Sequence, residues 1–198
     1  MNSESLTPRL ILASSSKYRK ILLRRFGIPF TSQTPGTDEG PGIDESPGDL
    51  VSRLAFEKAE CVSNENPQAI VIGSDQIAVC EGQIVGKPGN HPAAQEQLLS
   101  FSGRLIEFLT AVSVQCHDTG FKEMHIDCTR VRFRQLQADE IERYLQAETP
   151  YDCAGAFKAE SLGIVLFESI KSDDPTALIG LPLIHTAAML RRAGLRLP

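Results

Sequence analysis

The sequence predicts an α/β fold built on a mixed sheet, and three observations lead to that class. Strand-like and helix-like segments alternate along the 198 residues, as expected where helices cross over between strands. Two long strand-like arms, 105–116 and 121–133, flank a short turn and predict an antiparallel hairpin. The length suits one domain over residues 1–198, with 1–8 as a flexible extension, because domains contain about 150 residues.

Helices are predicted where a cap residue or proline starts a segment and glycine or proline follows its end. In chain order these segments are 17–26, 47–63, 92–101, 138–147 and 182–193. The second has the clearest start: Ser46 as cap, Pro47 at the first helical position and Asp49 three residues after the cap.

Short apolar or alternating segments between the helices predict strands. Besides the two long arms, they are 9–13, 30–34, 69–72, 76–80, 83–85 and 163–167. Glu81-Gly82 suits the tight turn of a hairpin. In the arm 121–133 the apolar alternation changes phase, which predicts a bulge near Thr129.

Charge and composition exclude several classes of protein. The net charge of −5 disfavours general nucleic-acid binding, because an acidic surface repels phosphate backbones. No apolar run approaches the ~20 residues that span a bilayer, and no secretory leader is visible, so we expect a cytoplasmic protein without membrane contact. Five cysteines without CxxC spacing predict reduced thiols rather than disulfides or a cysteine-based structural zinc site. A catalytic cysteine stays open, although small buried hydrophobes are the simpler interpretation.

The turn between the first strand and the first helix is a candidate phosphate site. It consists of three small hydroxyl residues, Ser14, Ser15 and Ser16. Free N–H groups at a helix N-terminus favour an anion. Lys17, Arg19 and Lys20 follow in the first turn, where the helix dipole disfavours cations unless they hold a ligand. A solvated basic helix is an equally good interpretation of these residues alone.

Lys58 falls near the centre of the apolar face of the second predicted helix. An unpaired buried ammonium is costly, so this position indicates either a cleft-facing lysine beside an anionic ligand or a side chain that reaches the helix edge. We favour the cleft.

Asp75 follows an apolar strand and Gly73, and ligand sites of open α/β sheets lie at the carboxyl ends of strands. A carboxylate there can hold Mg²⁺ or accept a proton from water, although a simple turn is a common alternative. Gly86-Lys87-Pro88 alone suits a plain exposed turn, and the loop 153–160 suits a pocket wall.

Acidic and basic residues are segregated near the N-terminus. Six Lys or Arg residues precede a loop that contains Asp38 and Glu39 among several acids and no base. This arrangement suits a site that holds a metal and a polyphosphate together, with Glu39 and Asp75 as its candidate metal ligands. For the later acids of the loop, solvation is the simpler explanation.

Taken together and in order, these motifs resemble the Maf family of nucleotide pyrophosphatases from about Arg9 to Ala193. The matching pieces are Leu10-Ile11-Leu12-Ala13-Ser14-Ser15-Ser16 with Arg19, Asp38-Glu39, Glu57-Lys58-Ala59, Gly73-Ser74-Asp75-Gln76, Gly86-Lys87-Pro88 and Cys153-Ala154-Gly155. The resemblance implies a twisted, largely antiparallel sheet in two lobes around a cleft, as in inosine-triphosphate pyrophosphatases.

The resemblance also implies an activity and residue roles. The activity is hydrolysis between the α- and β-phosphates of a nucleotide, with Mg²⁺ or Mn²⁺ as cofactor. The proton acceptor falls on Asp75. The phosphate-binding bases fall on Arg19, Lys58 and Lys87, and the specificity positions on Tyr18, Gln76 and Glu160.

Within the family, Ser74-Asp75-Gln76 and Phe157-Lys158-Ala159-Glu160 resemble the branch that acts on 7-methyl-GTP. The branch often has Pro-Trp where this chain has Lys17-Tyr18. A 7-methylguanine ring is cationic, so Tyr18 can stack on it and Glu160 can accept its N–H groups.

Two alternatives remain. One is a pyrophosphatase for other canonical or modified nucleotides, such as dTTP or UTP. The other is a non-catalytic nucleotide-binding regulator of septum formation, which would not need the Asp75 carboxylate. A nucleic-acid-binding module is disfavoured, and a homodimer is left open.

Overall fold

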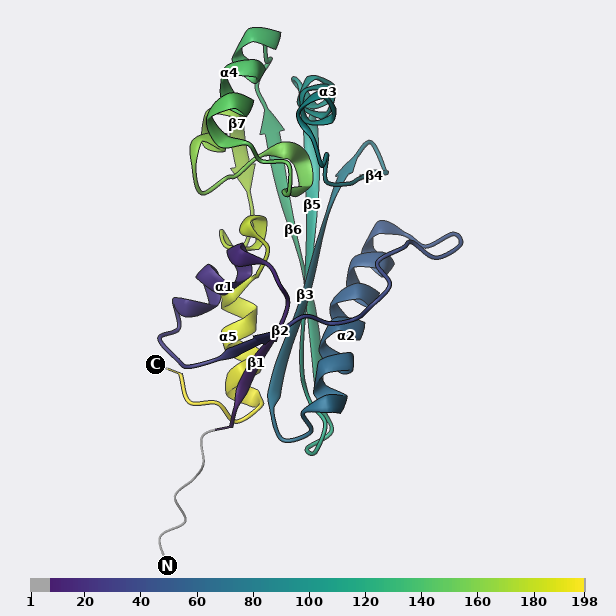
Figure 1. Ribbon diagram of the computed structural model, residues 1–198, viewed down its shortest axis with the longest axis vertical. Coiled ribbons are helices and arrows are strands. Elements are labelled where there is room, and N and C mark those ends of the chain that lie inside the picture. Colours follow the sequence, from purple (N-terminus) through teal and green to yellow (C-terminus); the bar gives the residue numbers. More distant parts are fainter. Residues whose placement is uncertain (1–7, 198) are drawn as a thin grey trace, which may run out of the picture.

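The structure, a computed structural model, describes residues 8–197 and contains a seven-stranded mixed sheet (Figure 1). Its strands are β1 (Leu10–Ala13), β2 (Thr31–Gln33), β3 (Ile70–Cys80), β4 (Gln83–Val85), β5 (Leu105–Cys116), β6 (Phe121–Phe133) and β7 (Phe167–Lys171). The helices are α1 (Lys17–Arg24), α2 (Pro47–Glu65), α3 (His91–Phe101), α4 (Ala138–Glu148) and α5 (Leu183–Arg192). The α/β class is therefore confirmed. The predicted extension 1–8 lies, except for Pro8, outside the described residues.

The sheet order is β2-β1-β3-β5-β6-β7, with β4 also paired to β3. β1 runs parallel to β2 and β3, and the other pairs are antiparallel. All five predicted helices form, with ends shifted by one or two residues. None of the helices in residues 8–197 is long and apolar enough to cross a membrane.

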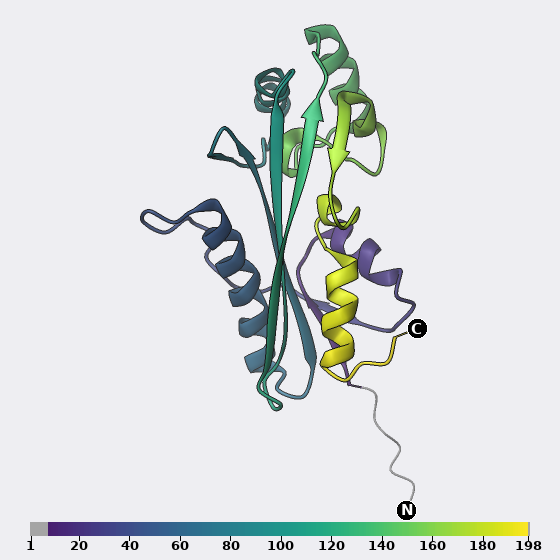
Figure 2. The same cartoon turned by 180° about the vertical axis from the view of Figure 1, so that it is seen from behind.

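Two lobes share the long strands β3, β5 and β6 (Figures 1 and 2). In one lobe, α2 covers one face of the sheet, and α1 with α5 covers the other. Alternation along the strands explains this: Leu12 and Ile72 pack under α1 and α5, whereas Ile11 and Val71 pack against α2. The other lobe, around α3 and α4, has its own core, which includes Phe101, Phe108, Phe133, Tyr144 and Phe157.

The predicted break between strands 69–72 and 76–80 is wrong, because β3 is continuous and pairs with β5 from Val71 to Val79. Gly73 marks a close approach rather than a turn. A Cβ atom at Gly73 would lie 2.3 Å from the Ala55 carbonyl oxygen and 2.5 Å from the Ala59 nitrogen. The glycine therefore lets α2 pack directly on β3.

Two further expectations fail at β6 and β7. The register between β5 and β6 is unbroken at Thr129, and the irregularity lies between Arg132 and Phe133, toward β7. The odd-numbered residues of β6 face inward along its whole length, polar His125 included, so apolar alternation was a misleading guide. The predicted strand 163–167 is instead mostly a 3-10 helix (Leu162–Leu166), and the exposed, polar β7 follows it.

Candidate active site

A pocket lies at a gap in one edge of β3. β1 pairs with β3 only as far as Gly73, and β4 pairs from Ala78 onward, so residues 74–77 have no described strand beside them there. Successive side chains on a strand point to opposite faces, and at an open edge both faces reach the same space. Asp75 and Gln76 consequently line one pocket from opposite faces of the sheet. The gap begins at the carboxyl end of β1, as expected for an α/β site, but lies midway along β3.

The cavity has a volume of about 410 Å³, within the roughly 300–1,000 Å³ typical of small-molecule sites. Every predicted site residue lines it: Ser14, Ser15, Ser16, Tyr18, Arg19, Glu39, Lys58, Asp75, Gln76, Lys87 and Glu160. Sequence reasoning missed the wall formed by 178–180 and the rim residue Asp152, whereas Lys17, named as a first-turn cation, also lines the rim. The segment 168–181 received no predicted element.

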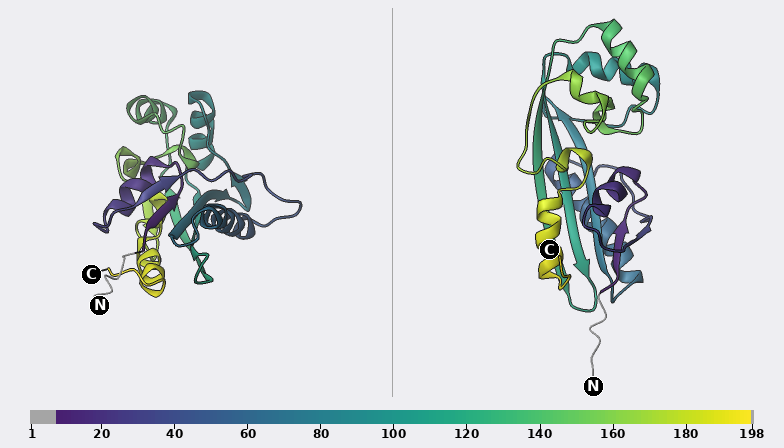
Figure 3. Two further views of the ribbon diagram at one scale, coloured as in Figure 1. Left: turned by 60° about the horizontal axis from the view of Figure 1, so that its bottom comes forward. Right: turned by 90° about the vertical axis from the view of Figure 1, so that its left-hand side faces the viewer.

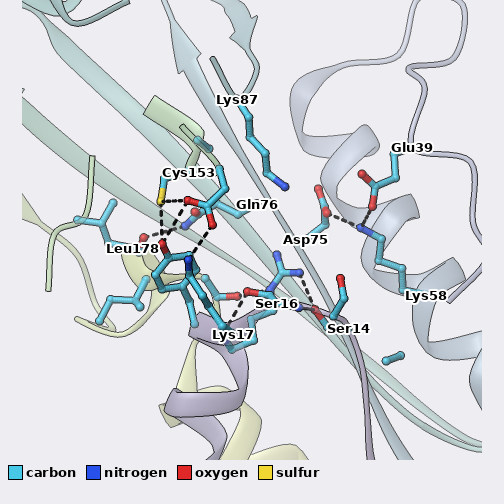
Figure 4. A pocket seen from close by; sticks show the side chains of 18 of the residues that line it. Ser14, Ser16, Lys17, Glu39, Lys58, Asp75, Gln76, Lys87, Cys153 and Leu178 are labelled. Atoms are coloured by element: carbon cyan, nitrogen blue, oxygen red, sulfur yellow. Dashed lines mark hydrogen bonds and ion pairs between the residues drawn. The ribbon is translucent and has the colours of Figure 1, made fainter. Parts of the chain in front are cut away.

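Lys58 lies between two carboxylates in this pocket (Figure 4). Only 5% of Lys58 is exposed, and its Nζ lies 2.7 Å from Asp75 Oδ1 and 2.5 Å from Glu39 Oε1. Lys58 therefore lines the cleft, as its place on the apolar face of α2 predicts. The hydrogen bond from Lys58 lowers the pKa of Glu39, and burial partly opposes this shift. Asp75 Oδ2 and Glu39 Oε2 have no hydrogen-bond partner within residues 8–197.

Arg19 reaches the pocket from the first turn of α1. Its Nε donates to the Gly180 carbonyl at 2.9 Å, and its Nη1 donates to Ser14 Oγ at 3.4 Å. Burial lowers the pKa of the guanidinium, while the charges of Asp75 and Glu39 raise it. Since an arginine stays protonated in proteins, it is a fixed positive charge next to the carboxylates.

The serine turn differs in detail from its predicted role. Ser16 caps α1 by accepting from the Arg19 N–H, and Ser14 Oγ accepts from the Ser16 N–H, so both hydroxyls have partners. Among the described residues, nothing accepts from the backbone N–H of Lys17 or Tyr18. These N–H groups at the helix N-terminus, rather than the serine hydroxyls, are the free donors that an anion can use.

Lys87 extends into the pocket from the loop between β4 and α3 (Figure 4). No described side chain forms a hydrogen bond or ion pair with its ammonium, which contributes to lowering the pKa of Glu39. The exposed turn expected from the sequence is present, and it also brings this unpaired cation over the cavity.

The opposite face of the gap is built from neutral hydrogen bonds. Gln76 Nε2 donates to Thr110 Oγ1 at 2.9 Å and to the carbonyls of Ala177 and Leu178 at 2.9 and 3.1 Å. These acceptors fix the amide orientation and leave Gln76 Oε1 without a described donor. Glu160 lies exposed at the rim, on the loop that follows the short 3-10 helix Ala154–Ala156.

Tyr18 closes one side of the rim. Its hydroxyl donates to Asp152 Oδ1 at 3.3 Å, while the Lys17 ammonium pairs with Asp152 and lies 4.9 Å from the Tyr18 ring centroid. Cys153 Sγ lies 3.4 Å from the Tyr18 hydroxyl, and burial raises the pKa of the thiol to about 11. Cys153 is thus a neutral thiol at neutral pH, which argues against the thiolate nucleophile that the sequence left open.

Two groups of described residues have the donors for a metal ion. Glu39 and Asp75 offer carboxylate oxygens in the pocket. Outside it, His125, Asp127 and His185 place one ligand atom each within 4.8 Å of one another. Sequence reasoning missed this second group because it assigned the inward face of β6 to the apolar residues.

Comparison with known proteins supports one assignment. A family model described as Maf-like protein matches residues 9–193. The 7-methyl-GTP pyrophosphatase of Albidiferax ferrireducens is 50% identical over 194 residues, covering 98% of both chains. Those of Xanthomonas campestris and Pseudomonas syringae are 52% and 50% identical, covering 98% and 96% of this chain and 100% of their own.

Among solved structures, the Staphylococcus aureus Ham1 protein aligns with a TM-score of 0.47 at 14% identity, covering 64% of this chain and 72% of its own. The family match spans both lobes and every residue of the gap in β3. The chain belongs to the Maf-like protein family.

Proposed function

We propose that the protein is a nucleotide pyrophosphatase that hydrolyses 7-methyl-GTP to 7-methyl-GMP and diphosphate. The observation that carries the proposal is the buried Lys58 held between Asp75 and Glu39, with Arg19 and Lys87 in the same cavity. The names of relatives at about 50% identity over nearly the whole chain support it.

The cations and free N–H groups of the pocket can bind the triphosphate. Phosphoryl transfer depends mainly on positioning and on neutralising charge, which Arg19, Lys58 and Lys87 supply from three different elements. The Lys87 ammonium has no described partner, so no carboxylate competes with a phosphate for it. The backbone N–H groups of Lys17 and Tyr18 can donate to a phosphate at the N-terminus of α1.

Asp75 is the proton acceptor of the proposed reaction. Lys58 holds its Oδ1 at 2.7 Å and leaves Oδ2 free. We assign to Oδ2 the proton of the attacking water, whose oxygen bonds to the α-phosphorus as the bond to the bridging oxygen breaks. Diphosphate leaves with that oxygen, and the nucleoside monophosphate retains the α-phosphate.

The donor set suits a divalent cation, and we propose Mg²⁺ or Mn²⁺. Arg19, Lys58 and Lys87 against Glu39 and Asp75 leave a single positive charge among these five groups, too little for a triphosphate. Glu39 has a free carboxylate oxygen, and Asp75 Oδ1 keeps a second lone pair beside its bond from Lys58, so both carboxylates can hold the ion while Oδ2 takes the proton. One or two carboxylates with substrate phosphates is the usual magnesium arrangement. When bound, the ion polarises the phosphate and offsets its charge.

Tyr18, Gln76 and Glu160 are the proposed base-reading residues. The ring of Tyr18 already has a cation, the Lys17 ammonium, near its face, so a cationic 7-methylguanine can take that place. Glu160 is exposed at the rim and can accept from the guanine N1–H and 2-amino groups. Gln76 Oε1 is a further free acceptor. We also propose a cytoplasmic location, because all five cysteines are free thiols.

A substrate screen tests the proposal. Purified protein with Mg²⁺ or Mn²⁺ is offered 7-methyl-GTP, GTP, dTTP and UTP, and diphosphate and monophosphate are quantified. We expect the highest kcat/KM on 7-methyl-GTP, with diphosphate released in one step. A higher kcat/KM on dTTP or UTP would instead assign the protein the activity of another branch of the family. Stepwise orthophosphate release would contradict the reaction, and binding without turnover of any nucleotide would favour a regulator.

A further inference from the structure

A second cluster of metal-ligating side chains lies between β6 and α5, outside the nucleotide pocket. His125 and Asp127 stand two residues apart on β6 and share the face that α5 covers (Figure 3). His185 comes from the first turn of α5. The rings of His125 and His185 stack, with centroids 3.4 Å apart and planes 10° from parallel.

The cluster leaves buried polar atoms without suitable partners. His185 Nδ1 is buried and has no hydrogen bond. Asp127 is 4% exposed, and within residues 8–197 the hydroxyls of Thr129 and Ser172 lie within hydrogen-bond distance of its Oδ1, at 3.5 and 3.3 Å. No basic side chain within residues 8–197 forms an ion pair with it. Burial of a carboxylate without a cation costs free energy.

We propose that His125, Asp127 and His185 bind a divalent transition-metal ion of the zinc class. Two imidazoles and one carboxylate suit Zn²⁺ and its neighbours, whereas Mg²⁺ prefers oxygen ligands alone. Bonds of about 2.0–2.1 Å place the ligand atoms of a tetrahedral site roughly 3.4 Å apart. From their present spread of up to 4.8 Å the ligand atoms move closer by up to about 1.4 Å, the two rings tilt out of their stack, and water takes the fourth position.

This ion stabilises the segment that forms the 178–180 wall of the nucleotide pocket. Ser172, beside Asp127, donates to the Asp174 carbonyl at 2.7 Å, and the buried Asp174 carboxylate accepts from the Ile184 N–H of α5 at 2.7 Å. The same segment continues to Gly180, whose carbonyl accepts from Arg19 and from Ser74. A metal joining β6 to α5 therefore anchors both ends of the segment 172–182. The role is structural and separate from the Mg²⁺ or Mn²⁺ proposed for the pocket.

Spectroscopic titration of the full chain with Co²⁺, after removal of metals by a chelator, tests the proposal without measuring activity. We expect one tightly bound equivalent with the visible absorption of four-coordinate Co²⁺, and without the near-ultraviolet bands of cobalt–thiolate bonds. Zn²⁺ should displace it and excess Mg²⁺ should not. In long-range ¹H–¹⁵N spectra of the wild-type protein, Zn²⁺ should shift the ring nitrogens of His125 and His185 among the four histidines.

Variants locate the ion. His125→Gln and His185→Gln should each weaken Co²⁺ binding at least about tenfold, since even indirect ligand partners contribute that much. His117→Gln, at an exposed histidine on the β5–β6 turn, should bind Co²⁺ as the wild type does, and Asp75→Asn should keep the one tight equivalent. Zn²⁺ at a hundredfold excess over Kd should shift the folding equilibrium about 100-fold, which raises Tm by roughly 5–10 °C.

The proposal is overturned by the absence of Co²⁺ or Zn²⁺ binding to the wild-type protein, by thiolate bands in the Co²⁺ spectrum, or by unchanged affinity in both histidine variants. Loss of the tight equivalent in Asp75→Asn would also overturn it, by placing the ion in the nucleotide pocket. Because the ring-nitrogen shifts are measured on the wild-type protein, a variant that fails to fold does not remove the test.

Discussion

The two faces of β3 at its open edge have different chemistry, although they belong to consecutive residues. On the α2 face, Asp75 joins Lys58 and Glu39 in a charged group with one buried ammonium. On the other face, Gln76 is held by neutral hydrogen bonds to two main-chain carbonyls and a hydroxyl. The comparison shows that the alternation of a strand can keep a charged group and a neutral hydrogen-bonded group apart within one pocket, so the proposed bond breaking and the proposed base recognition fall on different faces. We therefore expect substitutions on the α2 face to affect all nucleotides alike, and those on the other face and rim to change discrimination.

The largest expected effect is that of Asp75→Asn. Removing the proton acceptor should lower kcat about 10²- to 10⁴-fold on every nucleotide, with the far-ultraviolet circular dichroism unchanged. Asp139→Asn, at an exposed carboxylate on α4, is the matched control and should retain wild-type kcat. Turnover near the wild-type rate in Asp75→Asn would remove the proposed mechanism.

Lys58→Ala and Lys87→Ala should separate stability from binding on the charged face. Lys58→Ala leaves the buried Asp75 carboxylate without its cation, so we expect a loss on the order of 3 kcal/mol in the free energy of unfolding. Lys87→Ala breaks no described pair and should change stability by less than about 0.5 kcal/mol. Both should severely lower kcat/KM. Urea unfolding and steady-state kinetics measure the two quantities, and equal stability losses would contradict the buried-pair description.

Glu160→Gln should change discrimination rather than chemistry. A charge-assisted hydrogen bond contributes roughly 1.5–3 kcal/mol, so the affinity for 7-methyl-GTP should fall about ten- to a hundredfold, and that for neutral GTP less. Tyr18→Ala should act in the same direction through lost stacking. Glu168→Gln, at an exposed position of β7, is the control. If either rim variant lowers kcat/KM equally on 7-methyl-GTP, GTP and UTP, the rim does not read the base.

The smallest effect concerns pH and Glu39. Its pKa is lowered in the folded state, so the unfolded state binds more protons and the contribution of Glu39 to stability rises with pH. This contribution is present above the unfolded value of about 4.3 and disappears as the pH falls through the lower folded value. Because 63% of the side chain is exposed, we expect no more than about 1 kcal/mol. Urea unfolding of wild-type and Glu39→Gln protein across this range should show their free energies of unfolding converging at low pH. A difference that grows as the pH falls would contradict the lowered pKa of Glu39.

Local patterns predicted the helices and the position of Lys58, because caps and helical periodicity are written in nearby residues. They failed where a distant element sets the conformation. The local sequence predicts a turn at Gly73, but the packing of α2 against this glycine keeps the strand continuous. The local sequence also predicts an outward His125, but α5 covers that side of β6. The candidate residues could be chosen from motifs, but the gap at 74–77 that lets both strand faces meet one pocket depends on where β1 ends and β4 begins.

The continuous pairing of β3 with β5 also limits how the pocket can open. The backbone ladder runs from Val71 to Val79 and passes through both lobes, so a hinge beside Asp75 would have to break strand hydrogen bonds. Adjustment to a nucleotide is left to the segments outside the ladder, such as the loop with Glu39 and the loop with Lys87. The site is in this sense preorganised. We therefore expect the association rate of an anionic ligand to depend on electrostatic attraction and on small loop movements, rather than on a slow closure of two rigid lobes.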